Sequence, residues 1–336
     1  MKVRSLKVML LWGLLLTNFE VLAAQVGQDR VDQANRLIAE GKFEQAEKVL
    51  EAILLSETSP PPLVHYYLAY TLYNRNQLAR AESSLEKFLQ SSPESPSGRL
   101  LKAHLLFRRG KYQESAILAH GYLEQQPSSA NAHKLLGLDW FMLGRSEEAE
   151  RAFARASELA SSDVEAFYYL GRIRFERNNL IGALDAFQKA IALDPTHVKS
   201  LNHLGQTYEW MANYDLARES YLKSIENENR QATRSEWPFF NLGALYLKLA
   251  RPDEAVVYLR QALDRNPRWG EGKAKLAQAL LALNQPNEAL GLLKDAVALE
   301  PQNREARYRL AQLLLKSGQR EEALRQFELL EKSKHP

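Results

Sequence analysis

Small and bulky apolar residues recur along this chain at fixed intervals. A small residue, called the marker below, is followed twelve positions later by a second small residue and usually, four positions further, by a bulky apolar one. The markers are Ala34, Ala69, Ala103, Gly137, Gly171, Gly205, Gly243, Ala277 and Ala311. They are 34 residues apart, except for one step of 35 and one of 38. Self-similarity at such a period predicts a repeat architecture.

The spacing within each repeat predicts two consecutive helices. Small residues on both helices let their backbones approach closely, while the bulky residue fills the adjacent gap. A helix C-terminus favours a residue that tolerates left-handed backbone. Such residues stand seven positions after the marker in seven repeats: Gly41, Asn76, Gly110, Gly144, Asn178, Asn284 and Gly318. Five repeats also carry Pro 24 positions after the marker, where it ends the second helix.

This pattern resembles the tetratricopeptide repeat family, whose 34-residue helix–turn–helix unit has the same small, aromatic and Pro positions. The resemblance covers residues 27–336 in nine units. It implies an all-α fold, an α-solenoid of about nine tandem units that forms a right-handed superhelix with one concave surface. Arg174 departs from the pattern, because the family has a large apolar residue three positions after the marker. The step of 38 predicts a four-residue insertion near residues 232–235.

Residues 1–23 do not belong to the repeat. They have a basic start, an uncharged apolar run from Val8 to Leu16, and a small-residue end that includes Ala23. The run is shorter than the roughly 20 residues that span a bilayer. We therefore expect a cleaved signal peptide, with the mature protein in the periplasm or cell envelope if the source is bacterial, and in the secretory pathway or outside the cell otherwise. The alternative is an uncleaved anchor, through which the chain would contact the membrane.

Charge argues against a nucleic-acid partner. The whole chain has a formal net charge of +3. Residues 1–23 contain three basic residues and one acidic residue, so the remainder has 44 − 3 = 41 basic and 41 − 1 = 40 acidic residues, a net charge of +1. A nucleic-acid interface would require a basic stripe, which this balance does not provide.

A search for catalytic and metal-binding motifs predicts no enzyme, metal or cofactor. The chain has no cysteine, no Gly-rich phosphate loop, no HExxH and no Gly-x-Ser-x-Gly. His65 and His133 stand four positions before their markers, where packing residues are expected. The other histidines show no ligand-like spacing: His104, His120, His197, His203 and His335.

The concave groove is the remaining candidate surface. At about 100° per residue, the positions three before, one after and four after the marker lie opposite the core side of each first helix. These positions give a partner-binding prediction of Tyr66, Tyr70, Tyr73, His104, Phe107, Lys134, Phe141, Tyr168, Arg172, Phe175, Asn202 and Gln206. Tyr and Arg are enriched where interfaces carry binding energy. For Phe107, Phe141 and Phe175, packing between neighbouring first helices is an equal alternative.

The insertion has two interpretations. In one, Arg234 and Trp237 form a second contact patch at the rim of the groove. In the other, the extra residues are a surface loop with no role in binding, because such insertions cost little entropy.

We expect a non-enzymatic scaffold that binds a protein or peptide segment in its groove. Exported members of the family suggest envelope assembly, secretion or export complexes, an analogy at the level of fold. One alternative is a carbohydrate-polymer binder, since aromatic faces also stack on sugar rings. Another is an accessory subunit of an enzyme complex.

Overall fold

The computed structural model describes residues 29–231 and 234–332, which form helices joined by short turns. The predicted signal peptide, residues 232 and 233 of the insertion, and His335 lie outside the described residues. Within the described part of the chain there is no strand, which confirms the all-α prediction. No helix in these residues is long and apolar enough to span a membrane. The chain divides into two compact units, with the boundary in the sequence between Leu159 and Ala160.

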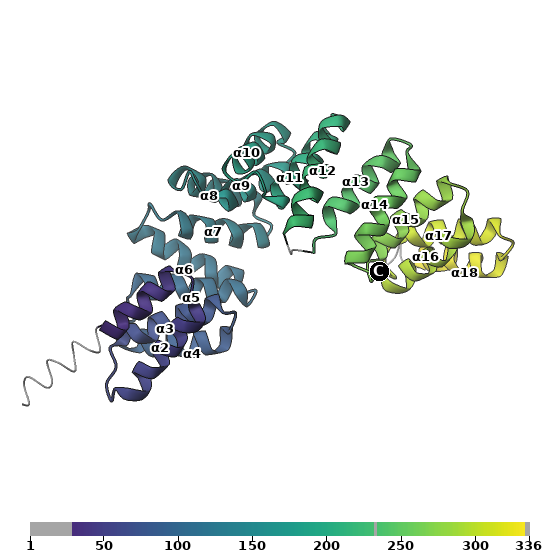
Figure 1. Ribbon diagram of the computed structural model, residues 1–336. Helices are drawn as coiled ribbons and strands as arrows, with labels where there is room; N and C mark the ends of the chain where they lie inside the picture. Colours follow the sequence, from purple (N-terminus) through teal and green to yellow (C-terminus); the bar gives the residue numbers. More distant parts are fainter. Residues whose placement is uncertain (1–28, 232–233, 333–336) are drawn as a thin grey trace, which may run out of the picture. The chain divides into compact units, whose positions relative to one another are not determined.

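Unit 1 consists of helix pairs that follow one another along the chain (Figure 1). Its first helices are residues 29–39 of the described chain, α3 (Pro62–Asn74), α5 (Pro96–Arg108) and α7 (Ala130–Met142). Its second helices are α2 (Phe43–Ser56), α4 (Leu78–Ser91), α6 (Tyr112–Gln125) and α8 (Ser146–Leu159).

Unit 2 continues the same arrangement (Figure 1). Its first helices are α9 (Val164–Glu176), α11 (Val198–Trp210), α13 (Trp237–Lys248), α15 (Gly270–Ala282) and α17 (Arg304–Lys316). Its second helices are α10 (Leu180–Leu193), α12 (Tyr214–Arg230), α14 (Pro252–Arg265), α16 (Pro286–Leu299) and α18 (Arg320–Lys332). Every marker therefore lies on a first helix and its small partner on the second, as the spacing predicts.

The turn within each pair is made by the residue seven positions after the marker. All seven Gly and Asn residues predicted at this position have a positive φ, for example 71° at Gly41 and 60° at Asn178. Ala212 and Ala250 stand at the same position and have φ of 59° and 56°. The left-handed backbone costs a residue with a Cβ about 1–2 kcal/mol. The helix pair imposes the turn even where the sequence does not favour it.

Close contact between paired helices depends on the size of the marker. A Cβ atom on Gly205 would stand 2.6 Å from the ring of Tyr221, and one on Gly171 would stand 2.6 Å from the ring of Phe187. Both rings are fully buried. The predicted combination of a small marker and a bulky residue sixteen positions later is confirmed at these two pairs.

A carboxyl group is buried between α5, α6 and α7 in unit 1. Asp139 is fully buried, and Ser115 Oγ lies 2.8 Å from Asp139 Oδ2 and 2.9 Å from the carbonyl oxygen of Ala103. The hydroxyl has one proton, so both hydrogen bonds form together when Asp139 is protonated and donates to Ser115. Burial raises the pKa of Asp139 to about 7. The fold thus favours the neutral acid.

Part of the extra length between the sixth and seventh repeats is helical. Helix α12 has 17 residues, whereas α10 and α14 have 14 each. Three of the extra residues therefore lengthen α12 by almost one turn, up to Arg230. Pro238 lies in the first turn of α13, as its fixed φ predicts.

Candidate functional site

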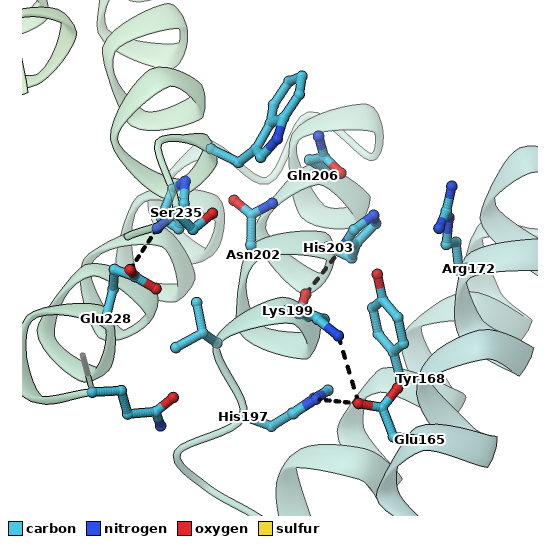
Figure 2. Close-up of a pocket in the computed structure, with 14 residues that line it drawn as sticks. Glu165, Tyr168, Arg172, His197, Lys199, Asn202, His203, Gln206, Glu228 and Ser235 are labelled. Carbon is cyan, nitrogen blue, oxygen red and sulfur yellow. Dashed lines mark hydrogen bonds and ion pairs between the residues drawn. The ribbon is translucent and has the colours of Figure 1, made fainter. Parts of the chain in front are cut away.

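Unit 2 contains a pocket of about 690 Å³ formed by α9, α11, the end of α12 and the start of α13 (Figure 2). Three successive repeats therefore contribute to it. Its lining residues are Glu165, Tyr168, Arg172, His197, Val198, Lys199, Asn202, His203, Gln206, Glu228, Gln231, Ser235, Trp237 and Pro238.

The added turn of α12 holds one wall of this pocket in place. The side-chain amides of Asn227 and Gln231 donate to the carbonyl oxygens of Pro195 and Thr196, at 3.2 and 2.9 Å. The carboxylate of Glu228, which is buried, accepts the backbone N–H of Ser235 at 2.6 Å (Figure 2). These bonds tie the insertion to the loop before α11 and direct the chain toward Trp237.

Trp237 is fixed by neighbouring rings. The centroid of its indole lies 4.9 Å from the ring centroid of Trp269 and 6.0 Å from that of Phe240. The rings of Trp269 and Phe240 are themselves 4.4 Å apart. The side chain nevertheless remains 47% exposed. It therefore offers a rigid aromatic surface at the edge of the pocket.

Tyr168 lies under a cluster of side chains from α11 and the turn before it. Its ring centroid is 5.5 Å from that of His197 and 5.4 Å from that of His203, and Lys199 Nζ lies 5.7 Å from it. Tyr168 is only 5% exposed, and burial raises its pKa to about 12. The hydroxyl group therefore stays protonated at neutral pH.

His203 is held in its neutral form. Its Nδ1–H donates to the carbonyl oxygen of Lys199 at 3.0 Å, and burial lowers its pKa to about 4. A charged imidazolium in this position would be desolvated and close to Arg172 and Lys199.

Charged groups of the pocket are largely paired with one another. Glu165 Oε1 lies 3.5 Å from His197 Nε2 and 3.6 Å from Lys199 Nζ (Figure 2). Arg172 Nε lies 3.4 Å from Glu176 on the next turn of α9. The pocket consequently carries no strong excess of either charge.

Two amide side chains face the pocket from α11 (Figure 2). Asn202 is 6% exposed, and its Oδ1 accepts a hydrogen bond of 2.9 Å from Asn241 Nδ2 on α13. This contact leaves the amino group of Asn202 as a donor toward the pocket. Gln206, one turn further along α11, adds a second amide.

Family models for the tetratricopeptide repeat match most of the chain. One matches residues 31–96, 100–158 and 141–198, another residues 197–268, and a third residues 280–335. The chain belongs to the tetratricopeptide repeat family.

Individual relatives are more distant. The chain is 26% identical to the protein CTR9 homolog of Arabidopsis thaliana. The match covers 57% of this chain and 19% of the CTR9 homolog. It is 25% identical to the protein O-mannosyl-transferase TMTC3 of Homo sapiens, in a match that covers 43% of this chain and 17% of TMTC3. This chain thus spans less than a fifth of either relative. Among solved structures, the anaphase-promoting complex hetero-tetramer Cut9–Hcn1 matches with a TM-score of 0.58 and 18% identity, covering 88% of this chain and 57% of the other.

The structure brings together part of the predicted partner-binding set. Four of its members line the pocket of unit 2: Tyr168, Arg172, Asn202 and Gln206. Trp237, which was predicted as part of the rim patch, lines it as well. Phe175 instead contacts Trp210, with ring centroids 6.0 Å apart. Arg234 is exposed and does not line the pocket.

In unit 1, the predicted groove residues pack mainly on other side chains. The ring of Tyr66 lies 5.2 Å from that of Phe88, Tyr73 lies 5.9 Å from His104, and Phe107 lies 5.4 Å from Tyr112. His104 is also close to Asn131, at 3.2 Å, and burial lowers its pKa to about 4. Lys134 and Phe141 are half-buried, whereas Tyr70 is exposed. These contacts favour the packing alternative for Phe107.

Several pocket residues were not predicted. Glu165 and Lys199 stand six positions before their markers, one turn beyond the predicted face, so extending that face would have found them. His197 and His203 have no sequence pattern in common, yet both contact Tyr168. Glu228 and Ser235 depend on the extension of α12. Among the described residues, no group of three or more His, Asp or Glu is arranged to hold a metal ion.

Proposed function

We propose that this protein is a non-enzymatic scaffold that binds a segment of a partner protein in the pocket of unit 2. The observation that carries the proposal is the convergence of aromatic, amide and cationic side chains from three successive repeats on one pocket. Trp, Tyr and Arg are the residue types that most often anchor protein interfaces. Membership of the tetratricopeptide repeat family adds support at the level of fold.

Photo-crosslinking tests this role. A benzophenone amino acid replaces Gln206, which lines the pocket, or Lys189, which is exposed on α10. Proteins crosslinked in the cells of origin are identified by mass spectrometry. A binding role predicts one dominant partner at position 206 that is absent at position 189. Equal labelling at both positions, or none at 206, would contradict it.

We further propose that the protein is exported and works in a cell-envelope assembly, secretion or export complex. The basic start, apolar run and small-residue end of residues 1–23 support this proposal. The expected mature N-terminus is Ala24 or Gln25. Intact-mass analysis of protein from the cell envelope tests it, and retention of Met1 through Ala23 would favour an uncleaved anchor instead.

A further inference from the structure

The wall at the start of α13 is apolar and rigid. Trp237 and Pro238 line the pocket there, and Val198 lines it from α11; none of the three carries a charge. Contacts with Trp269 and Phe240 fix the indole of Trp237, so little side-chain entropy is lost when a flat apolar group stacks on it. Proline rings are recognised on aromatic surfaces of this kind.

Two side-chain amides of α11 lie beside this wall (Figure 2). The amino group of Asn202 is available because its Oδ1 is occupied by Asn241, and the amide of Gln206 lies one turn away. The acidic groups already have partners, since Glu165 pairs with His197 and Lys199, and Glu228 accepts the N–H of Ser235. The pocket therefore suits an occupant that offers carbonyl groups to these amides and an apolar ring to Trp237.

A proline-rich segment has this composition. Proline lacks the backbone N–H, and a polyproline II helix has no internal hydrogen bonds, so all its carbonyl groups are available to donors. Because the charges of the pocket are paired internally, a strongly acidic or basic segment would gain little. Lys199 and Gln206 are separated by about 10 Å along α11, at ~1.5 Å per residue. This length accommodates about three residues of polyproline II, or one turn.

We propose that the pocket between α9, α11 and the start of α13 binds a proline-rich segment of a partner protein in the polyproline II conformation. This inference rests on the proposed scaffold function and specifies the chemistry of the partner. The added turn of α12 supports this recognition, since Glu228 on that turn holds Ser235 two residues before Trp237.

Binding of fluorescein-labelled decaproline to the protein without residues 1–23, followed by anisotropy, tests the inference. A Gly-Ser decamer with the same label is the peptide control, and a labelled cellohexaose tests for carbohydrate. The expected result is saturable binding of decaproline alone. Trp237→Ala should weaken it at least tenfold. Asn202→Asp retains the acceptor for Asn241 but removes the amino donor, and should weaken binding three- to tenfold.

Trp210→Ala is the matched control, because Trp210 is a 69% exposed indole on α11 that does not line the pocket. Its affinity for decaproline should equal that of the parent, and thermal melts should show that all variants fold. Decaproline binding no tighter than that of the Gly-Ser peptide would overturn the inference, as would cellohexaose binding that depends on Trp237. A partner crosslinked at position 206 without decaproline binding would refute only this inference, whereas absence of that crosslink refutes the scaffold function itself.

Discussion

Tyr66 in unit 1 and Tyr168 in unit 2 occupy the same position of their repeats, three residues before the marker, but their surroundings differ. Tyr66 packs on Phe88 of the neighbouring second helix. Tyr168 packs under His197 and His203 and lines a pocket whose far wall is Trp237. The residue types of the groove face are thus not sufficient to make a site. In unit 2, the irregular spacing between two repeats supplies the wall.

The largest expected effect is on the pH dependence of stability, which should differ between the two units. The pKa of Asp139 in unit 1 is raised from 3.8 to about 7. Between about pH 4 and 7 the unfolded chain loses this proton while the folded chain keeps it, so stability falls as pH rises through this window. Asp139→Asn retains a donor for Ser115. It should exceed the parent in stability by about 2–4 kcal/mol above pH 7, at ~1.4 kcal/mol per pKa unit, and by much less near pH 4.

Urea unfolding at several pH values, with hydrogen exchange to assign the change to unit 1, measures this difference. His104 in the same unit has a lowered pKa and gives the opposite slope, but it is present in both proteins and cancels in their difference. In unit 2, His203 has a pKa of about 4 in place of 6.5, so stability there should fall as pH drops through that interval. A constant difference between Asp139→Asn and the parent would show that Asp139 is charged in the folded protein.

The next effect tests the close helix contact on which the pocket is built. Gly205→Ala places a Cβ 2.6 Å from Tyr221 and should destabilise unit 2 by about 1–3 kcal/mol, because a packed core tolerates added volume poorly. Gly291→Ala in α16 is the control, since no atom lies within 4 Å of its Cβ, and it should stabilise the helix by up to about 1 kcal/mol. Thermal melting of both variants measures the two changes in stability. Equal changes for Gly205→Ala and Gly291→Ala would contradict the packing argument.

A smaller effect is expected from loosening the wall without touching the core. Glu228→Ala removes the acceptor of the Ser235 N–H and should reduce partner affinity several-fold, with a loss of stability of about 1–3 kcal/mol. Glu226→Ala breaks an exposed pair with Arg230 on the same helix and should change both quantities little. Calorimetric titration with the partner identified by crosslinking compares the affinities of the Glu228→Ala and Glu226→Ala variants. Equal affinities would mean that the wall does not depend on Glu228.

The smallest effect concerns Arg234. Its side chain is exposed and does not line the pocket, so Arg234→Ala should leave partner affinity within about twofold, as exposed charges contribute little. The same titration measures it. A loss greater than fivefold would restore Arg234 to the contact patch that the sequence predicts.

The helix pairs were predictable from the sequence because they depend on local size and on turn residues. Gly41 and Asn178 indicate their turns directly, whereas Ala212 and Ala250 adopt the same backbone only because the paired helices impose it. The site was predictable only in part. A helical wheel finds Tyr168 and Asn202 from one repeat at a time, but the contacts of His197 and His203 with Tyr168 join two repeats.

The insertion was detectable as a change of period, but its conformation was not. Whether extra residues form a loop or extend a helix depends on the partners of Asn227, Glu228 and Gln231, which lie 7 to 35 residues away in sequence. Such partners are known only once the fold has brought them together.

The hydrogen bonds that support the pocket wall lie within residues 195–235, and the rings that fix Trp237 belong to Phe240 and Trp269. These supports of the wall therefore lie within one continuous segment, residues 195–269. Transferred as a whole into an array of otherwise regular repeats, this segment would bring them along. Protein engineers who assemble solenoids from identical modules thus have here a segment that adds one wall of a pocket to a regular array.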